Sequence, residues 1–461
     1  MKRNLAEEIW EVNIPFVPHT KAEAAAMLRE IGVKDFEELL AGIPDEARLK
    51  QPLDLPGGMS EMEALRELKR LAEMNRRMIC FAGGGVYDHF QPAAVDAIIS
   101  RPEFYTAYTP YQPEVSQGTL QAIFEYQSLI CDLTGMEVSN ASLYCGGTAL
   151  AEAAMLAVRH TGRNKILAGE NIHPYHLQIL RTYGKAFPFE TVLIPADEGT
   201  IAESRLKSML DERTAGVIVQ HPNFYGLLEE MGELGAAVHS NNSLFISSFD
   251  AISLGILQSP GEYAADIAVG EGQSLGNGLN YGGPYLGIIA SQQKYVRSLP
   301  GRIVGETADK EGKRGYVLTL QTREQHIRRE KATSNICTNQ ALCALAAAVF
   351  LCLLGKAGIK EMADQSMQKA HYLADEILKK TSFKMKYPGK PFFKEFLISS
   401  NIRAKKVIDA LAKKNLLVGP SLGRFHPAKD EHSFLAAVTE SRTKNEMDWL
   451  VEELKQVKSK K

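Results

Sequence analysis

The segment that starts at Cys145 combines two glycines with a threonine at the start of a helix-forming run. In CGGTALAEAAMLAVRH, Gly146 and Gly147 allow a close backbone approach, and Thr148 stands where the helix begins. Unpaired N–H groups and the positive end of the helix dipole would form a cradle for a phosphate group. A glycine turn with Thr148 as a simple N-cap explains the same residues. The motif alone leaves both interpretations open.

Two further polar residues follow apolar, strand-like runs. His173 comes after KILAGE, where an imidazole would either stack on a cofactor ring or cap the next helix. Asp250 ends the run SLFISSFD. Enzymes that use pyridoxal phosphate (PLP) place a carboxylate beside the pyridinium nitrogen of the cofactor, and the end of a parallel strand is a suitable position for it. As a lone acid Asp250 would mean little, but its distance to the next motif supports this interpretation.

That motif is GEGQSLGNGLNYGGPYLG, residues 270–287, with seven glycines in 18 residues. Such a density of glycine demands unusual backbone angles or close contact with another group. A dinucleotide-binding fingerprint fits poorly, because the Gly276-x-Gly278 pair is followed by neither x-x-Gly nor a helix. A structural contact between subunits and a loop beside a cofactor phosphate both remain, with Gly282 and Gly283 as candidates for the latter.

The chain has no lysine at any of the 86 positions from 208 to 293, between Lys207 and Lys294. PLP enzymes hold their cofactor as an imine on a lysine amine. The surroundings of such a cofactor are thus present without its covalent anchor. We therefore expect that the chain does not carry out this chemistry alone.

Composition excludes several other classes of function. The net charge of −2 gives no electrostatic case for nucleic acid or an anionic membrane as a partner. The six cysteines lack CxxC spacing, so we expect buried free thiols in the cytoplasm rather than disulfides or a zinc site. The longest apolar run, 341–354, is shorter than the about 20 residues of a membrane span, which predicts a buried helix. The N-terminal MKRNLAEEIWEV has no apolar run typical of a secretory signal.

The order of the expected elements predicts an α/β protein. Apolar runs of strand length at 165–170, 191–196, 215–222, 243–250 and 264–272 alternate with helical segments, which favours a mostly parallel sheet. We expect an N-terminal helical arm over 1–75, with capping boxes at Thr20/Glu23 and Ser60/Glu63. A large α/β domain over 76–335 and a connecting helix with a small α/β domain over 336–461 follow. The basic segment 322–339 is interpreted as a solvated helix that leads into a capped helix start.

Long blocks of the chain resemble the glycine decarboxylase (P-protein) of the glycine cleavage system, and within that family the subunit 1, or α chain, of the two-chain form. The similarity runs from residue 14 to beyond residue 350 and continues weakly to the end. Its most specific blocks are 105–144, 148–157, 219–229, 265–287, 299–307 and 315–342.

The resemblance implies the PLP-dependent, aspartate-aminotransferase-like fold (fold type I). In the active chain of this family a lysine precedes the glycine-rich turn. Counted back from Gly282-Gly283-Pro284, its place is taken here by Gln273, whose amide cannot form an imine. Cys145 is a second departure, since the family leads us to expect an acidic residue there. His173 and Asp250 stand at matching places in a vestigial or shared pocket, and no catalytic residue is assigned to this chain.

The resemblance also implies a reaction and partners for the complex: decarboxylation of glycine with PLP, and transfer of the aminomethyl group to the lipoyl arm of the H-protein. This chain would pair with a lysine-bearing subunit 2 as α2β2. Two alternatives stay open. One is a self-sufficient PLP enzyme with a relocated lysine, of which Lys294 and Lys331 are the nearest. The other is a non-catalytic protein that binds the H-protein.

Overall fold

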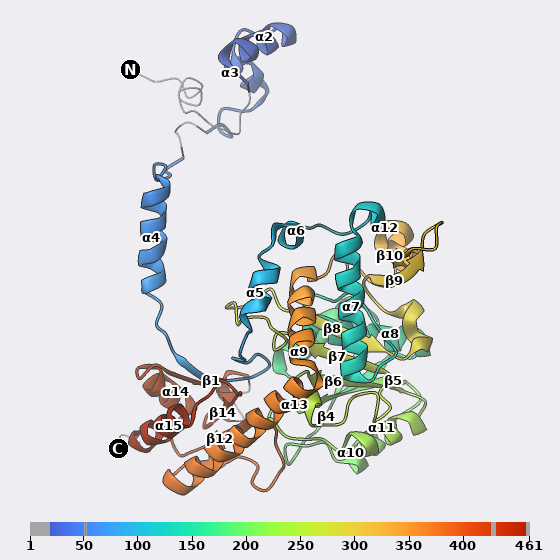
Figure 1. Cartoon of the computed structure of the whole chain (residues 1–461), viewed down its shortest axis with the longest axis vertical. Helices are drawn as coiled ribbons and strands as arrows, with labels where there is room; N and C mark the ends of the chain where they lie inside the picture. The colour runs from blue at the N-terminus through green and yellow to red at the C-terminus, as the bar shows by residue number, and fades with distance from the viewer. Residues whose placement is uncertain (1–18, 50, 52, 426–429, 458–461) are drawn as a thin grey trace. The chain divides into compact units, whose positions relative to one another are not determined.

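The computed structural model describes residues 19–49, 51, 53–425 and 430–457 (Figure 1). Two compact units separate after Arg76, one over residues 1–76 and the other over 77–461. The N-terminal stretch that argues against a secretory signal, and most of the segment 14–20, lie outside the described residues. The boundaries expected at residues 75 and 335 stay predictions.

The first unit contains the helices that the capping boxes predict. α2 (Lys21–Ile31) begins after Thr20 and ends at Gly32, and α4 (Glu61–Glu73) begins after Ser60, each with a complete capping box. Between them lie α3 (Phe36–Leu39) and the 3-10 turn η1 (Leu40–Gly42). Both predicted helix starts are confirmed, because the reciprocal side-chain bonds satisfy N–H groups that a helix start otherwise leaves free.

The second unit is built on a seven-stranded sheet with the order β2-β8-β7-β6-β5-β3-β4. Strands β3 to β7 run parallel, whereas β8 is antiparallel to β7 and to β2. The strands are β2 (Val138–Ser139), β3 (Lys165–Gly169), β4 (Glu190–Ile194), β5 (Thr214–His221), β6 (Leu244–Asp250), β7 (Ile267–Glu271) and β8 (Gly287–Ser291). The central strands are buried on both faces, as the continuous apolar runs predict.

Helices cover both faces of this sheet (Figure 1). On one face α8 (Gly146–Thr161) and α9 (Pro174–Ala186) contribute to a common apolar core. On the other face lie α5 (Ala93–Ile99), α7 (Gln117–Thr134), α10 (Glu203–Met209), α11 (Met231–Ser240) and the first part of α13 (Ala341–Lys380). This arrangement is the predicted α/β class with a mostly parallel sheet. It brings the carboxyl ends of β5, β6 and β7 together at one edge.

The helix α13 contains the predicted apolar run. Gly355 has non-helical angles (φ 57°, ψ −172°), so an apolar helix and an amphipathic helix meet there, as the sequence indicates. By length and composition α13 is the one helix among the described residues that passes as a membrane span. Half of its most apolar stretch is buried, including Phe350 in the core of the large sheet, and the run before the break is 14 residues long. It is therefore a core helix.

Of the expectations about the segment before α13, the solvated face is confirmed, because most of residues 322–331 are exposed, whereas the extent of the helix and the capped helix start are wrong. The helix in the basic segment is a single turn, α12 (Gln325–Arg328), between the 3-10 turns η5 (Gln321–Arg323) and η6 (Arg329–Lys331). The start of α13 has no side-chain cap. The N-cap residue of α13 is Gln340, and the Asn339 amide before it donates to the Ala141 carbonyl and the Ser142 hydroxyl.

The C-terminal part forms a small antiparallel sheet of β11 (Lys384–Met385), β12 (Glu395–Ser399) and β14 (Ser433–Ala437), with α14 (Ala404–Ala412) and α15 (Lys444–Gln456) against it. Beside it β1 (Ile79–Ala82) pairs in parallel with β13 (Leu416–Gly419). Neither this pair nor the hairpin of β9 (Ile303–Ala308) and β10 (Arg314–Thr319) is evident from the sequence pattern. The remaining short turns are α6 (Pro102–Tyr105), η2 (Pro113–Val115), η3 (Ser253–Gly255), η4 (Gln293–Ser298) and η7 (Leu422–Arg424).

Gly226 allows the large sheet and the C-terminal sheet to approach closely, and it yields a testable prediction. It has φ +83°, and a Cβ there would lie 1.8 Å from the Glu395 carbonyl oxygen. Gly389 has a similar φ of +76° but no atom within 4 Å of such a Cβ. Both changes to alanine cost about 1–2 kcal/mol of backbone strain, but Gly226→Ala adds an overpacking cost of about 1–3 kcal/mol.

We expect the free energy of unfolding to fall clearly more for Gly226→Ala than for Gly389→Ala. Chemical denaturation of the full-length variants measures both values. Equal losses would mean that the backbone contact at Gly226 relaxes without cost.

Candidate functional site

A small cavity lies at the carboxyl ends of β5, β6 and β7, where parallel sheets bind their ligands. Side chains from the loop after β1 and from the start of β12 close it, including Tyr87 and Lys394. Two predicted site residues, His173 and Asp250, line it. Its volume is about 50 Å³, far below the about 300–1,000 Å³ of typical small-molecule pockets.

Asp250 ends β6 and is held by charge and by backbone donors. Its Oδ2 lies 2.7 Å from the Lys394 ammonium, whose side chain is only 2% exposed. Its Oδ1 accepts bonds from the N–H groups of Ile252 and Ser253 at 3.0 and 3.1 Å. Burial raises the pKa of Asp250, but the Lys394 charge outweighs it and holds the pKa below its ordinary value. The carboxylate is therefore ionised and already has a cation beside it.

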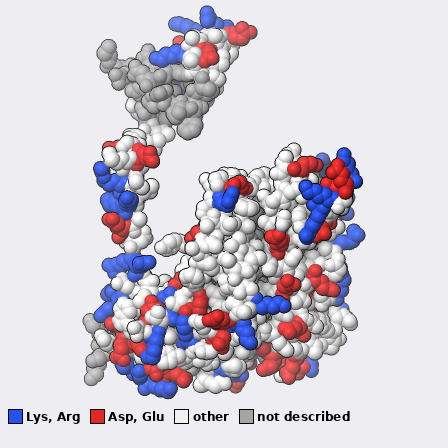
Figure 2. Space-filling model, viewed as in Figure 1, with Lys and Arg blue, Asp and Glu red and all other residues white. Residues whose placement is uncertain are grey.

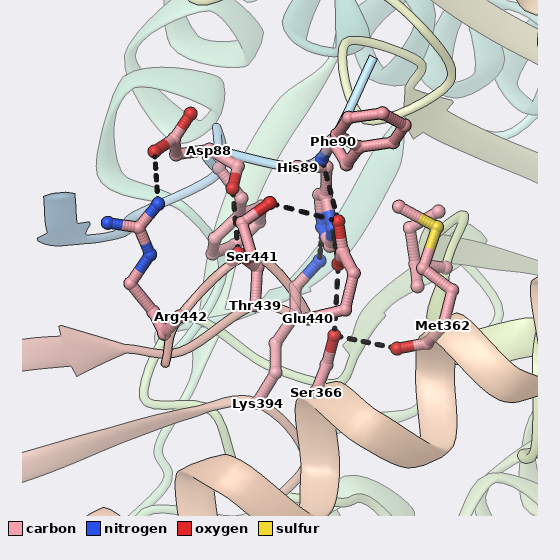
Figure 3. A network of polar contacts seen from close by, with 12 residues as sticks. Asp88, His89, Phe90, Met362, Ser366, Lys394, Thr439, Glu440, Ser441 and Arg442 are labelled. Atoms are coloured by element: carbon pink, nitrogen blue, oxygen red, sulfur yellow. Dashed lines mark hydrogen bonds and ion pairs between the residues drawn. The ribbon is translucent and has the colours of Figure 1, made fainter. Parts of the chain in front are cut away.

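The Lys394 ammonium has two further neighbours that use its remaining donors. Its Nζ lies 3.0 Å from His89 Nε2 and 3.8 Å from the centre of the Tyr87 ring. On its other side, His89 Nδ1 lies 2.7 Å from a carboxylate oxygen of Glu440 (Figure 3). Burial and the Lys394 charge lower the pKa of His89. A neutral imidazole that accepts from Lys394 and donates to Glu440 fits these contacts.

Gln273, at the position where the resemblance expects a lysine, has a side chain that is bonded on both ends. It is buried, and its Oε1 accepts from the Tyr87 N–H at 3.0 Å. Its Nε2 donates to the Tyr87 carbonyl at 3.2 Å and to the Asn277 carbonyl at 2.8 Å. The amide thus fixes the backbone at Tyr87 and offers no nucleophile.

The glycine motif begins α8, but a carboxylate already occupies the N-terminus of this helix. Glu271 Oε2 accepts from the Gly146 N–H at 2.9 Å, and Oε1 accepts from Gln273 and Leu286. Burial raises the pKa of Glu271 to about 7. A Cβ on Gly147 would lie 2.4 Å from the side chain of Ile179. The close approach that these glycines permit is therefore made by the chain's own residues.

Two expectations about helix caps are decided by the structure. The N-cap of α8 is Cys145, so the interpretation of Thr148 as an N-cap is wrong, and its Oγ1 contacts the Cys145 thiol at 3.3 Å instead. His173 does cap its helix, because its Nδ1 accepts from the Tyr175 N–H at 3.2 Å. Its Nε2 lies 2.7 Å from the Gly84 carbonyl, and burial lowers its pKa. A neutral imidazole that donates from Nε2 satisfies both contacts.

The structure gathers only part of the predicted set. His173 and Asp250 line the cavity, while Gln273 and Gly146 are linked to each other through Glu271. Gly282 and Gly283 do not line it. They have φ of +131° and +123° in a loop whose neighbour Tyr281 is fully exposed.

The residues present do not fit PLP. At the position where the resemblance leads us to expect the imine-forming lysine stands the Gln273 amide, Asp250 is paired with Lys394, and the Glu271 carboxyl group accepts from the N–H of Gly146 at the start of α8. PLP needs an anion that is free to face its ring nitrogen, and a positive potential where its phosphate binds. The polar groups around Asp250 are thus bonded to one another.

Sequence reasoning missed the residues that decide this outcome. Lys394 lies in the run FKEFLISS, where a lysine beside a strand is ordinarily a solvated residue. Glu271 lies within the glycine-rich motif, and His89 stands in a segment with no distinctive pattern. A clue exists only for Glu271, since it directly ends a fully buried strand.

The comparisons with known proteins agree with this fold. The sequence model of the family described as "Glycine cleavage system P-protein" matches residues 15–454. A protein of Chlorobaculum parvum named "Probable glycine dehydrogenase (decarboxylating) subunit 1" is 53% identical over 445 residues, 96% of this chain and 99% of that protein. A protein of Carboxydothermus hydrogenoformans with the same name is 50% identical over 442 residues, 95% of this chain and 99% of that protein.

Solved structures extend the comparison. The crystal structure of an inhibitor-bound glycine decarboxylase (P-protein) of the glycine cleavage system has a TM-score of 0.87 and 43% identity, and covers 96% of this chain and 99% of that chain. A sphingosine-1-phosphate lyase from Burkholderia pseudomallei has a TM-score of 0.65 at 15% identity, over 89% of this chain and 94% of that chain, and shows the fold alone. The predicted fold type I is thereby confirmed. With a family match over nearly its whole length and relatives at about half identity, the chain belongs to the glycine cleavage system P-protein family.

Proposed function

We propose that this chain is subunit 1 of a two-chain glycine decarboxylase, inactive alone, whose partner subunit holds PLP on a lysine. The complex decarboxylates glycine and passes the aminomethyl group to the lipoyl arm of the H-protein, in the cytoplasm and as an α2β2 assembly. The observation that carries the proposal is Gln273: its amide stands at the anchor position and is bonded at both ends to the backbone.

The names of the relatives support a partner chain, because the proteins of Chlorobaculum parvum and Carboxydothermus hydrogenoformans are both called subunit 1. The charged groups around the cavity also support a cofactor held by the partner chain. Lys394 and Glu271 present the wrong charge to a pyridinium and to a phosphate, respectively. A PLP-dependent family member with such a site needs a second chain for its cofactor.

An apolar surface around the first turn of α13 supports the same proposal. A groove of about 220 Å³ lies between the segment before α7 and this turn, lined by Tyr105, Tyr108 and Leu342. The side chain of Tyr108 is 82% exposed. In Figure 2 the face over α7 carries few charged side chains, whereas basic and acidic residues are interspersed over the C-terminal part. A protein partner fits such a surface better than nucleic acid or a membrane does.

The glycine-rich loop extends this surface. Asn277 donates to the Cys343 carbonyl at 3.3 Å, which holds the start of the loop against α13. At its tip Tyr281 is fully exposed. We assign this surface, defined by Tyr105, Tyr108, Tyr281 and Leu342, to the partner subunit.

A self-sufficient enzyme with a relocated lysine is the second candidate. Lys294 is exposed on η4 and paired with Asp266, and Lys331 lies on an exposed turn, so neither lines the cavity. Lys394 does line it, which gives this candidate one specific observation. Its ammonium is, however, engaged by Asp250, the group that the cofactor ring would need.

Incubation with PLP followed by borohydride reduction and peptide mapping tests the proposal. For the chain alone we expect no stoichiometric pyridoxyl label, because no free amine faces the site. For the complex we expect one label, on the partner subunit. A stoichiometric label on Lys394 in the chain alone would instead establish the second candidate. Binding of lipoylated H-protein to the chain without its partner would favour the scaffold alternative.

The partner surface gives a further prediction. Tyr108→Arg places a charge in the apolar groove, and we expect it to weaken binding of the partner subunit at least about tenfold, as loss of a buried aromatic anchor does. Trp449→Arg is the matched control, because Trp449 is a partly exposed aromatic residue on α15. Sedimentation or light scattering of the mixed subunits measures the affinity. Unchanged binding for Tyr108→Arg would exclude this groove from the interface.

A further inference from the structure

Lys394 is an unusual residue for the core of this unit. It is among the largest fully buried side chains, and its ammonium contacts one carboxylate, one imidazole and one aromatic ring. Lysine is rarely buried unless it is paired, because removal of an ammonium ion from water is costly. The three contacts direct all three N–H donors to acceptors or to the ring face.

The position of this ammonium beside Asp250 indicates its role. It lies 2.7 Å from Asp250, the carboxylate at the end of β6. In enzymes of this fold the matching carboxylate faces the cationic nitrogen of the cofactor ring. Lys394 therefore supplies, from the chain itself, a positive charge at the point where the ring would supply it.

We infer that Lys394 is a built-in counterion, which replaces the cationic ring of the cofactor at Asp250. Together with Glu271 at the N-terminus of α8 it closes this site to PLP. The site becomes a structural joint, that is, a set of contacts that holds distant segments of the chain together. The group that the site accepts beside Asp250 is a primary alkylammonium ion. The counterion role holds whichever chain of a complex anchors the cofactor.

The joint connects segments that are far apart in the sequence. From Lys394 the contacts pass through His89 to Glu440, which follows β14. Glu440 also accepts from the Phe90 N–H and, at 3.5 Å, from the Ser366 hydroxyl on α13 (Figure 3).

A second set of contacts joins the same segments. Arg442 pairs with Asp88 at 2.9 Å, and the Thr439 hydroxyl donates to the Asp88 carbonyl at 2.7 Å. The large sheet, the loop after β1, α13 and the C-terminal sheet thus meet around the ammonium of Lys394.

A double-mutant cycle tests the counterion role. Lys394→Met keeps the side chain as far as its Cε but removes the ammonium and leaves the Asp250 carboxylate without a cation, so we expect the apparent midpoint of thermal unfolding to fall by about 5–10 °C. Asp250→Asn alone leaves the ammonium unpaired and also lowers the midpoint. The double variant removes both charges, and we expect its loss to be clearly smaller than the sum of the two single losses.

Lys405→Met is the matched control for this cycle. Lys405 and Asp409 form an ion pair of the same 2.7 Å length, but their side chains are 82% and 56% exposed. We expect this variant to change the midpoint by no more than about 1 °C. Additive losses at Lys394 and Asp250, or a Lys394→Met loss no larger than that of the control, would overturn the proposal.

Chemical rescue tests the assigned chemistry directly. Lys394→Ala removes three carbons and the ammonium, which n-propylammonium replaces atom for atom. We expect this ion to raise the unfolding midpoint of Lys394→Ala, and neither 1-propanol nor sodium chloride at the same concentration to do so. The unchanged chain should not respond to any of the three.

Equal rescue by 1-propanol would show that the site needs volume rather than charge and would overturn the counterion role. If Lys394→Ala does not fold, the double-mutant cycle decides the question. Both tests use the chain alone and no PLP, so their outcome is separate from that of the labelling experiment.

Discussion

The ionised carboxylate of Asp250 at the buried end of β6 requires a positive partner, and much of the surrounding structure follows from how this chain meets that requirement. A buried unpaired charge is strongly destabilising. Lys394 supplies this positive charge at 2.7 Å. Contacts with His89 and the ring of Tyr87 offset the cost of burying its ammonium. One ion pair therefore fixes the loop after β1, the start of β12 and the contact with Glu440.

The loop after β1 shows how a position associated with catalysis becomes structural. Gln273 bonds both the N–H and the carbonyl of Tyr87, and the Tyr87 hydroxyl donates to Glu395 at 2.9 Å. The other oxygen of Glu395 accepts from the Gly84 N–H at 2.6 Å, and burial raises the pKa of Glu395 to about 7. Gln273, at the position where the resemblance leads us to expect the lysine, thus holds the backbone of Tyr87.

The likeness to other fold type I proteins describes the scaffold and leaves the chemistry to individual side chains. The sphingosine-1-phosphate lyase shares the fold at 15% identity, and a common fold does not transfer a site. In this chain three features act together: an amide at Gln273, where the resemblance leads us to expect an amine, an internal cation beside Asp250, and the carboxyl group of Glu271 at the start of α8. Together they leave a complete fold with a closed site.

The sequence by itself determined the features that depend on local patterns. Alternating apolar and helical runs gave the parallel sheet, side-chain caps at Thr20 and Ser60 gave the helix starts, and the lack of lysine over 208–293 removed the usual anchor. Asp250 was recognisable because it directly ends a strand. The caps, the apolar runs and the strand end at Asp250 each lie within a few residues, where periodicity and capping act.

The tertiary structure alone decided what surrounds Asp250. The pairing of β1 with β13, the burial of Lys394 and the bond from Gly146 to Glu271 join residues far apart in the chain. No local pattern encodes the partners in such contacts, because lysine and glutamate side chains are ordinarily solvated. The close packing of the two sheets at Gly226 and Glu395 brings these charged groups into a largely buried space, where they are paired.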